Sequence, residues 1–576
     1  MKLKTVRSAV LSSLFASQVL GKIIPAANKR DDDSNSKFVK LPFHKLYGDS
    51  LENVGSDKKP EVRLLKRADG YEEIIITNQQ SFYSVDLEVG TPPQNVTVLV
   101  DTGSSDLWIM GSDNPYCSSN SMGSSRRRVI DKRDDSSSSG SLINDINPFG
   151  WLTGTGSAIG PTATGLGGGS GTATQSVPAS EATMDCQQYG TFSTSGSSTF
   201  RSNNTYFSIS YGDGTFASGT FGTDVLDLSD LNVTGLSFAV ANETNSTMGV
   251  LGIGLPELEV TYSGSTASYS GKAYKYDNFP IVLKNSGAIK SNTYSLYLND
   301  SDAMHGTILF GAVDHSKYTG TLYTIPIVNT LSASGFSSPI QFDVTINGIG
   351  ISDSGSSNKT LTTTKIPALL DSGTTLTYLP QTVVSMIATE LGAHYSSRIG
   401  YYVLDCPSDD SMEIVFDFGG FHINAPLSSF ILSTGTTCLL GIIPTSDDTG
   451  TILGDSFLTN AYVVYDLENL EISMAQARYN TTSENIEIIT SSVPSAVKAP
   501  GYTNTWSTSA SIVTGGNIFT VNSPQTASFS GNLTTSTASA TSTSSKRNVG
   551  DHIVPSLPLT LISLLFAFIW KPVHKV

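Results

Sequence analysis

The sequence predicts an all-β protein built from two related lobes. Its 576 residues leave room for several domains and a large core. Long stretches with helical hydrophobic spacing are scarce, whereas short apolar runs broken by Gly, Asn and Ser recur along the chain. Two segments, 98–105 and 368–375, share one pattern, in which an apolar run delivers an Asp to a turn of Gly and hydroxyl residues. One such turn is common by chance. A matched pair predicts a duplicated lobe that brings two carboxyl groups face to face.

The first 21 residues predict a cleaved signal peptide. A positively charged start at residues 2–7 precedes an apolar stretch at 9–20 and the small residue Gly21. This apolar stretch is too short to cross a bilayer as a stable helix. Several Asn-x-Ser/Thr sequences, which are acceptors for N-glycosylation, fit passage of the chain through a glycosylating pathway.

Secretion makes the four cysteines candidates for disulfide bonds. Four cysteines allow three pairings. The sequential pairing, Cys117–Cys186 with Cys406–Cys438, keeps each bridge inside one expected lobe, and we prefer it for that reason.

Residues 22–67 predict a pro-segment. This stretch is rich in charge and ends in the dibasic pair Lys66-Arg67, directly before the β-rich region that starts at residue 68. A dibasic pair at such a border indicates a processing site, although it could also be an ordinary exposed charge pair. The basic and apolar stretch 37–42 would then lie across an acidic cleft and hold it closed.

Two catalytic lobes are expected at 68–270 and 271–480. Alternating residues predict strands, for example at 81–87 and at 96–100, and a helix is expected at 381–391, directly after a proline. Residues 118–185 interrupt the first lobe with basic clusters, a Ser run and a Gly-rich run. This composition cannot bury a core, so we expect a mobile surface insertion that is open to proteolytic nicking.

The C-terminal residues predict attachment to a cell surface. Residues 481–548 are rich in Ser and Thr and resemble an O-glycosylated stalk. Residues 549–576 then read as a signal tail that is removed when a glycolipid (GPI) anchor is attached at Asn548. The basic flank 571–575 leaves a single membrane span as the alternative. The expected location is the outer face of the plasma membrane or the cell wall, with wall glycan as a further partner.

Charge and motifs exclude several classes of function. A formal charge of −16 and a pI near 4.8 argue against nucleic acid as a partner and suit cationic substrates. The sequence lacks the Gly-x-Ser-x-Gly motif of serine hydrolases and the His-Glu-x-x-His motif of zinc enzymes. We expect neither a cofactor nor a metal.

Two adjacent carboxyl groups can hydrolyse an amide without a metal. They cannot both ionise easily, so they share one proton over a wide pH range. The charged member draws a proton from a bound water while the protonated member polarises the scissile carbonyl. The pair titrates as a unit, so the acid and base roles are assigned jointly.

The two turns, Asp-Thr-Gly-Ser-Ser at 101–105 and Asp-Ser-Gly-Thr-Thr at 371–375, resemble the active-site turns of pepsin-family aspartic proteases. Segment 211–214 (Tyr-Gly-Asp-Gly) resembles the flap hairpin of that family, and segments 250–254 and 452–455 resemble the apolar-apolar-Gly segments that pack behind each turn. The resemblance covers roughly residues 80–478 and implies a bilobal all-β fold with its active site between the lobes.

The resemblance also implies a role for each matching residue. Asp101 and Asp371 would form the catalytic dyad, Thr102 and Ser372 would cross-link the turns, and Tyr211 would close over the substrate. The turn glycines Gly103 and Gly373 also match, and the hydroxyls of Ser104 and Thr374 would bond the outer carboxylate oxygens. Gly212 matches the flap residue after the tyrosine, and Trp108 would be the aromatic partner of Tyr211. The loop closed by Cys406 and Cys438 likewise matches the second-lobe disulfide loop of the family.

The leader, insertion, stalk and anchor signal narrow the resemblance to the yapsins, fungal cell-surface aspartic proteases that cut at basic sites. This implies peptide substrates with Lys or Arg, in precursor or cell-wall proteins. Asp213 would place a carboxylate at the flap tip to attract a basic side chain. The alternative is that Asp213 is a turn residue facing solvent. The rival function is a catalytically silent protease fold with a structural or binding role in the cell wall.

Overall fold

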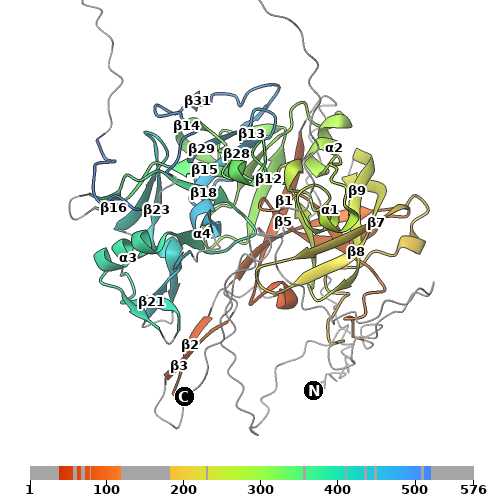
Figure 1. Ribbon diagram of the computed structural model, residues 1–576, viewed down its shortest axis with the longest axis horizontal. Coiled ribbons are helices and arrows are strands. Elements are labelled where there is room, and N and C mark those ends of the chain that lie inside the picture. Colours follow the sequence, from red (N-terminus) through yellow and green to blue (C-terminus); the bar gives the residue numbers. More distant parts are fainter. Residues whose placement is uncertain are drawn as a thin grey trace, which may run out of the picture. The chain divides into compact units, whose positions relative to one another are not determined.

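The computed structural model describes residues 38–55, 61–66, 72–77, 80–118, 182–228, 231–354, 358–397, 399–408, 411–433, 437–445, 450–507 and 511–520 (Figure 1). The chain divides into two compact units, 1–521 and 522–576. The predicted signal peptide, Arg67, most of the predicted insertion, Asn548 and the predicted tail lie outside the described residues. Lys66 is described as the last residue of a strand.

One large sheet joins the two halves of the chain. Among the described residues it has 14 strands. In spatial order these are β31 (Val497–Lys498), β14 (Tyr318–Pro326), β29 (Glu471–Ala477), β28 (Ala461–Asp466), β11 (Thr293–Tyr297), β12 (His305–Phe310), β1 (Val39–Gly48), β4 (Gln80–Val89), β5 (Gln94–Asp101), β10 (Gly249–Gly252), β6 (Leu107–Met110), β9 (Leu231–Thr244), β8 (Phe216–Leu228) and β7 (Arg201–Ser210).

The smaller sheets belong mainly to the second half of the chain. One contains, in spatial order, β15 (Asp343–Ile346), β18 (Ile366–Leu370), β27 (Thr451–Leu453), β19 (Thr377–Leu379) and β26 (Ile442–Pro444). Two four-stranded sheets have the orders β17 (Lys359–Thr362), β16 (Gly348–Asp353), β22 (Met412–Asp417), β23 (His422–Pro426) and β20 (His394–Ser396), β21 (Tyr401–Leu404), β25 (Cys438–Leu440), β24 (Ile431–Ser433). Two-stranded sheets pair β13 (Ala312–Asp314) with β30 (Ile486–Ile488) and β2 (Glu61–Lys66) with β3 (Glu72–Thr77).

Helices are short. The α-helices are α1 (Ser265–Ser270), α2 (Phe279–Asn285), α3 (Gln381–Glu390) and α4 (Asp455–Leu458), and the 3-10 helices are η1 (Leu51–Asn53), η2 (Thr194–Gly196), η3 (Pro256–Leu258), η4 (Ser332–Ser334) and η5 (Leu427–Phe430). Within the described part of the chain, no helix has the length and apolar character needed to cross a membrane. The all-β prediction is confirmed.

Helix α3 confirms the predicted helix at 381–391. Its buried residues Val383, Val384 and Ile387 follow helical spacing and cover one face. The helix ends before Gly392, whose φ of +66° lies in the left-handed region that ends many helices.

The same three-strand arrangement occurs in each lobe. In the first lobe, β5 runs parallel to β10, and β10 runs antiparallel to β6. In the second lobe, β18 runs parallel to β27, and β27 runs antiparallel to β19. The strand that leads to each acidic turn therefore has the same neighbours, as expected for a duplicated lobe.

The stretch 37–42 does not lie across a cleft as the sequence suggested. Residues 39–48 form β1, which pairs with β12 on one side and β4 on the other. Alternate residues explain this placement, because Val39, Leu41 and Phe43 are buried in the main apolar core.

Ordered structure also continues beyond residue 480, where the sequence suggested the start of a stalk. Residues up to 520 include two strands that pair with the second lobe. Scattered apolar residues explain the difference, since Ile489, Ala499 and Ile518 are all buried. Their irregular spacing gives no periodic signal in the sequence.

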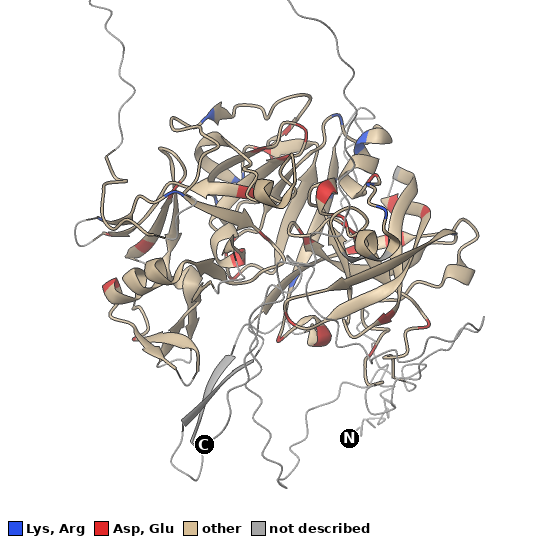
Figure 2. Ribbon diagram, viewed as in Figure 1, with Lys and Arg blue, Asp and Glu red and all other residues tan. Residues whose placement is uncertain are grey.

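Both preferred disulfides are present, Cys117–Cys186 and Cys406–Cys438. Basic residues are fewer than acidic ones, 34 against 50 in the whole chain. Figure 2 marks Asp and Glu positions in red along the ribbon of both lobes.

Candidate active site

The two acidic turns meet at the junction of the lobes. Asp101 is the last residue of β5, and Asp371 directly follows β18. A Cβ atom built on Gly103 would lie 2.5 Å from Asp371 Oδ1, and one built on Gly373 would lie 2.5 Å from Asp101 Oδ1. Only glycine leaves room at these two positions. Each carboxyl group thus occupies the space beside the glycine of the opposite turn.

Hydrogen bonds tie the two turns together in a reciprocal way. Thr102 N donates to Ser372 Oγ at 3.2 Å, and Ser372 N donates to Thr102 Oγ1 at 2.9 Å. Each hydroxyl also donates to a carbonyl of the opposite strand, Thr102 to Leu370 at 3.0 Å and Ser372 to Val100 at 3.3 Å. Both residues are buried, so these four bonds form in a water-poor environment where they hold the geometry firmly.

Each carboxyl group is also oriented within its own turn. Asp101 accepts hydrogen bonds from Gly103 N at 2.8 Å and Ser104 Oγ at 2.5 Å. Asp371 accepts the equivalent bonds from Gly373 N at 2.8 Å and Thr374 Oγ1 at 2.5 Å. The predicted support residues of both turns are therefore all brought to the two carboxyl groups.

Burial raises the pKa of both carboxyl groups in this pair. Burial, followed by the negative charge of Asp371, raises the pKa of Asp101 well above the usual carboxyl range. Burial also raises the pKa of Asp371. Two carboxyl groups in contact cannot both carry a full charge, so the pair holds one proton where isolated carboxyl groups would be ionised.

A hairpin from β7 to β8 carries the predicted flap residues. Tyr211 N donates to Thr215 O at 2.8 Å, and Gly214 takes a φ of +84° at the turn. Trp108 is fully buried, and its indole Nε1 donates to Tyr211 Oη at 2.6 Å. The structure thus brings the tyrosine of the hairpin and the tryptophan of β6 together.

Asp213, at the tip of this hairpin beside Gly212, faces the predicted pro-segment. Its Oδ1 accepts from Thr215 N at 2.9 Å and Thr215 Oγ1 at 2.6 Å, which closes the turn. Its Oδ2 accepts from Leu51 N at 2.8 Å, at the start of η1. Leu51 and Val54 are buried in an apolar cluster with Trp108. One oxygen of Asp213 is therefore used in the turn, and the other binds the segment that covers this cluster.

Sequence reasoning missed a buried acidic group behind the first turn. Asp106 is buried and accepts from Val260 N at 2.9 Å and Tyr276 Oη at 2.7 Å, and burial raises its pKa to about 6. Glu259 is also buried, accepts from Tyr276 N at 2.9 Å, and has a pKa raised by burial to about 9. The signal for Asp106 was its place directly after the first turn; Glu259 lay in an irregular loop and gave no signal.

A second missed carboxyl group lies behind the second turn. Asp455, directly after the Gly454 predicted to pack there, accepts a hydrogen bond from Ser81 Oγ. Ser81 N in turn donates to Thr375 Oγ1 at 2.7 Å. Burial raises the pKa of Asp455 well above its usual range. The residue was visible in the sequence, but its contact with Ser81 of β4 depends on the fold.

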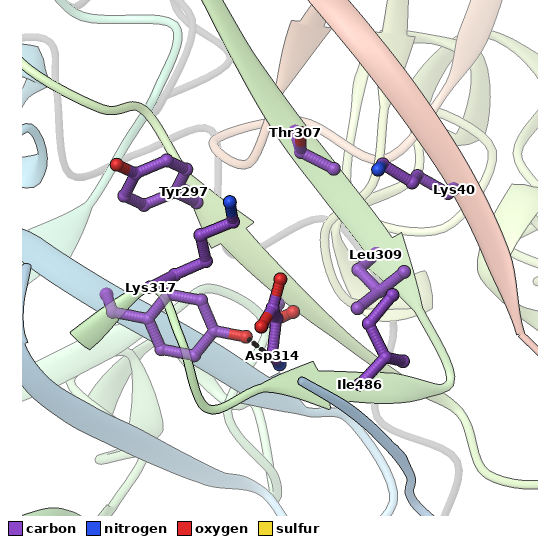
Figure 3. Close-up of a pocket in the computed structure, with 9 residues that line it drawn as sticks. Lys40, Tyr297, Thr307, Leu309, Asp314, Lys317 and Ile486 are labelled. Carbon is purple, nitrogen blue, oxygen red and sulfur yellow. Dashed lines mark hydrogen bonds between the residues drawn. The ribbon is translucent and has the colours of Figure 1, made fainter. Parts of the chain in front are cut away.

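One cavity lies apart from the dyad, between β1, β12 and the C-terminal segment (Figure 3). It offers about 20 Å³ to water, which is room for one molecule. Within the described ranges, no group of three or more His, Cys, Asp or Glu residues has a metal-binding arrangement.

The geometry supports one kind of chemistry. Two buried carboxyl groups that share a proton can activate a water molecule and protonate a leaving group in the same site. The buried hydroxyls fix both groups, and the hairpin with Tyr211 is bonded to Trp108 of the first lobe. Such a site can hydrolyse an amide without a covalent intermediate.

Comparisons with known proteins agree with this geometry. The family model described as eukaryotic aspartyl protease matches residues 82–165 and 168–477. Three similar proteins come from Saccharomyces cerevisiae (strain ATCC 204508 / S288c). Aspartic proteinase 3 is 99% identical over 569 residues, which cover 99% of this chain and 100% of that protein. Aspartic proteinase MKC7 is 57% identical, covering 84% of this chain and 81% of that protein. Aspartic proteinase yapsin-3 is 48% identical, covering 90% and 86% respectively.

Proposed function

Since the chain belongs to the eukaryotic aspartyl protease family and is an aspartic endopeptidase, we propose that Asp101 and Asp371 are its catalytic dyad and that it cleaves beside Lys or Arg. The observation that carries the dyad is the reciprocal geometry of the turns, in which each glycine faces the opposite carboxyl group. The observation that carries the basic preference is the carboxylate of Asp213 at the flap tip.

The reaction uses the shared proton of the dyad. The ionised carboxyl group takes a proton from water as the water oxygen attacks the scissile carbonyl carbon, and the protonated carboxyl group donates to the carbonyl oxygen. The tetrahedral intermediate then collapses, and a proton passes to the leaving nitrogen. Water is consumed, one peptide bond breaks, and the dyad returns to its single-proton state. The raised pKa values of both carboxyl groups support this state.

Thr102 and Ser372 hold the reacting groups in place. Their four hydrogen bonds fix the distance between the turns before substrate arrives. This preorganisation matters because small misplacements of reacting groups lower rates strongly. Ser104 and Thr374 keep the outer carboxyl oxygens occupied, which leaves the inner ones for water.

Tyr211, held by Trp108, would close over the substrate and exclude water. The pro-segment must leave first, because Leu51 and Val54 occupy the apolar cluster under the hairpin. Its departure frees Oδ2 of Asp213 from the Leu51 amide. That oxygen could then accept a charge-assisted hydrogen bond from an ammonium or guanidinium group of the substrate.

The proposed setting is the cell surface. The signal peptide, the Ser/Thr-rich residues before 548 and the apolar tail support secretion, and a glycolipid anchor at Asn548 would hold the enzyme at the plasma membrane or in the wall. Substrates with basic residues in precursor or cell-wall proteins would meet the acidic surface there. The pair Lys66-Arg67 is the proposed processing site of the pro-segment.

The test of the basic preference uses paired peptides with Lys/Arg or Leu/Phe beside the scissile bond. Asp213→Asn removes the charge but keeps an oxygen for Thr215, so the hairpin turn survives. We expect kcat/KM for the basic peptides to fall by about tenfold to a hundredfold, with little change for the apolar peptides. Glu88→Gln is the matched control, since Glu88 is exposed on the same lobe. An unchanged ratio in Asp213→Asn would remove Asp213 from the specificity site.

A further inference from the structure

The residues after the family match form a defined part of the second lobe. The match ends at residue 477, yet the structure describes the chain as far as residue 520. Residues 481–507 and 511–519, here called the C-terminal strap, run across β13, β14 and the segment between β17 and β18 (Figure 1). What this addition does is not explained by the family fold alone.

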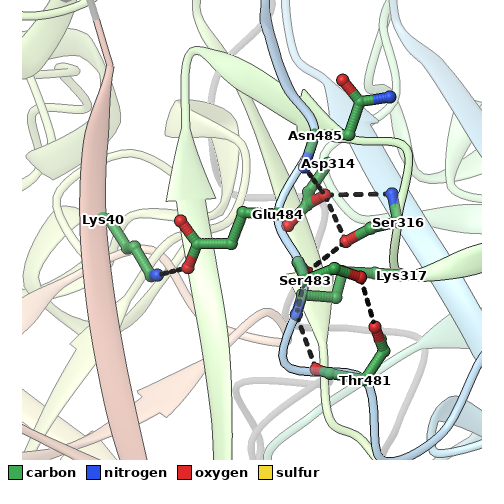
Figure 4. Close-up of polar contacts among 8 residues, drawn as sticks. All are labelled: Lys40, Asp314, Ser316, Lys317, Thr481, Ser483, Glu484 and Asn485. Carbon is green, nitrogen blue, oxygen red and sulfur yellow. Dashed lines mark hydrogen bonds and ion pairs between the residues drawn. The ribbon is translucent and has the colours of Figure 1, made fainter.

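The first part of the strap is held by a polar network (Figure 4). Asp314 accepts from Asn485 N at 2.8 Å and from Ser316 Oγ at 2.7 Å, while Ser316 Oγ lies 2.5 Å from Ser483 O. Lys317 Nζ donates to the carbonyls of Thr481 at 3.0 Å and Ser483 at 3.1 Å. The strap then forms β30 against β13. This end is therefore fixed to the strand pair that starts at Ala312.

The middle of the strap is held by burial and by strand pairing. Strand β31 runs parallel to β14, and Ala499 N donates to Thr324 O at 2.9 Å. Ile489 is fully buried, and Val493 and Ala499 are nearly so. Apolar residues at these positions would be unusual in a solvated stalk.

The last part of the strap lies along residues 360–365, which comprise the end of β17 and the connection 363–365 to β18. Five hydrogen bonds join the two segments: Ser507 N to Lys365 O at 2.9 Å, Val513 N to Thr364 Oγ1 at 2.7 Å, Thr362 Oγ1 to Val513 O at 2.6 Å, Gly515 N to Leu361 O at 2.8 Å and Ile518 N to Thr360 Oγ1 at 3.0 Å. Five of the six residues 360–365 are thus bonded to the strap, three in β17 and two in the connection to β18.

Ile518 anchors the end of the strap by packing against β16. Its side chain fits a hollow over β16, where a Cβ atom on Gly348 would come within 2.6 Å of it and one on Gly350 within 3.0 Å. Its carbonyl oxygen lies 2.9 Å from His422 Nε2 of β23. The side chain is only 8% exposed. Burial of this side chain and the contact of its backbone together indicate that Ile518 is a specific anchoring residue of the strap.

The residues bonded to the strap directly precede the strand that carries the second acidic turn. Strand β18 begins at Ile366, one residue after the bonded connection, and delivers Asp371. The strap also reaches the partner strand of β18, because Thr345 Oγ1 of β15 donates to Thr505 O at 3.4 Å. We propose that the C-terminal strap is a positioning segment of the catalytic body, which holds the entry of β18 and thereby the place of Asp371.

The first lobe shows why the second needs such support. There β5 is entered from the tight hairpin with β4, in which Val89 pairs with Gln94. The hairpin fixes the entry of β5 locally. The chain enters β18 from β17, whose pairing with β16 has a register shift, and Thr362 of β17 is also bridged to Thr514 of the strap.

The test compares two substitutions of the same chemistry in the full chain. Ile518→Asp puts a charge into this anchoring contact, whereas Val513→Asp puts it on a side chain that is 63% exposed on the same strap. Hydrogen exchange is followed at strap residues 511–519 and in β15 and β18. Peptide hydrolysis is measured per active site, with sites counted by a transition-state-mimicking aspartic protease inhibitor, so that loss of folded protein is separated from a slower reaction.

We expect Ile518→Asp to speed exchange in both the strap and β18 and to lower kcat per site by roughly tenfold, with a smaller change in KM. Val513→Asp should match the wild type. The conservative variant Ile518→Val should keep most of the wild-type rate. Faster exchange of the strap with unchanged exchange in β18 and unchanged kcat would overturn the proposal. So would a strap that stays protected in Ile518→Asp, because Ile518 would then not be its anchoring residue.

A milder variant covers the case in which Ile518→Asp is not secreted. Thr364→Val removes the acceptor of Val513 N while keeping the shape of the side chain. It should speed exchange in β18 and lower kcat per site by about twofold to threefold. The same variant with β18 and kcat unchanged would refute a positioning role. The exchange measurements need no substrate, so they remain informative whatever the substrate preference proves to be.

Discussion

The turn at Asp101 and the turn at Asp371 make the same hydrogen bonds, yet each lobe supports its turn with different groups. Each carboxyl group accepts from a glycine amide two residues on and from a hydroxyl three residues on, with matching distances in the two lobes. The groups behind the turns are not matched. The hydrogen bonds made directly to the two carboxyl groups are therefore symmetric, while the groups behind the turns differ.

The difference is clearest in where buried carboxyl groups lie. The first turn is followed by the buried acid Asp106, and the second by Leu376 at the same place. Behind the second turn the buried acid is Asp455, where the first lobe has Ile253. Each lobe thus buries an acid behind its turn, but at a different position and with different partners. A carboxyl group of this kind is not dictated by the reaction itself.

The largest expected effect tests the symmetric part of the comparison. Asp371→Asn and Asp101→Asn should each lower kcat by about a thousandfold or more, because an amide cannot share the proton of the pair. Equal losses would show that the two turns contribute equally. Peptide hydrolysis at acidic pH checks this, with inhibitor binding as the control for an intact cleft. A variant that keeps a tenth of the wild-type rate would break the dyad assignment.

The next effect tests Glu259, a second buried acid of the first lobe beside Asp106. The pKa of Glu259 is raised from 4.5 to about 9, so between these values the folded state holds a proton that the unfolded state has lost. The free energy of unfolding must therefore fall as pH rises across this window. Glu259→Gln should remove this slope and stabilise the protein at pH 7 by about 3 kcal/mol, with no change near pH 4. Denaturant unfolding at both pH values, with Glu88→Gln as control, measures it; parallel curves for variant and wild type would contradict it.

A smaller effect tests the bonds between the turns. Thr102→Val and Ser372→Ala each remove two hydrogen bonds across the lobe junction and leave a buried amide without its acceptor. Each should lower the free energy of unfolding by about 2 kcal/mol. If the two hydroxyl groups stabilise the lobe junction equally, the two losses of unfolding free energy should agree within about 1 kcal/mol. Urea unfolding measures both, and a loss in only one variant would show that one hydroxyl alone links the lobes.

The smallest effect concerns the hairpin of β7 and β8, which belongs to the first lobe. Tyr211→Phe removes the hydroxyl that accepts from Trp108 Nε1 and should lower kcat/KM by about tenfold or less. Stability should change little, since the ring remains in place. Steady-state kinetics on one peptide checks this. Tyr206→Phe, at an exposed position on β7, serves as the control. A loss as large as that of Asp371→Asn would mean that the hydroxyl takes part in the chemistry.

Much of the site could be predicted from the sequence because its signals are local. Asp101, Asp371 and their hydroxyl neighbours lie within five residues of one another in each turn, so the pattern is visible without the fold. The same holds for the flap stretch around Tyr211. The meeting of the two turns followed from duplication, since matched strands in two related lobes must bring matched ends together.

The rest of the site depends on contacts between distant segments. Nothing in the sequence connects Ser81 with Asp455, or Ile518 with Gly348, because neither pair shares a motif or a period. The strand at Val39 was expected to cover a cleft from its charge, but its alternating apolar residues place it in a sheet. In each case tertiary packing decided the outcome over local composition.

The contact of each turn glycine with the opposite carboxyl group has a consequence for how the two lobes can change over generations. A methyl group at residue 103 would collide with an oxygen that belongs to the other lobe, and the reverse holds at residue 373. The two halves of a duplicated gene would normally be free to diverge. Here each half carries a residue whose identity is set by the other half. An alanine arising in one turn would be selected against even if that lobe, taken alone, folded perfectly well.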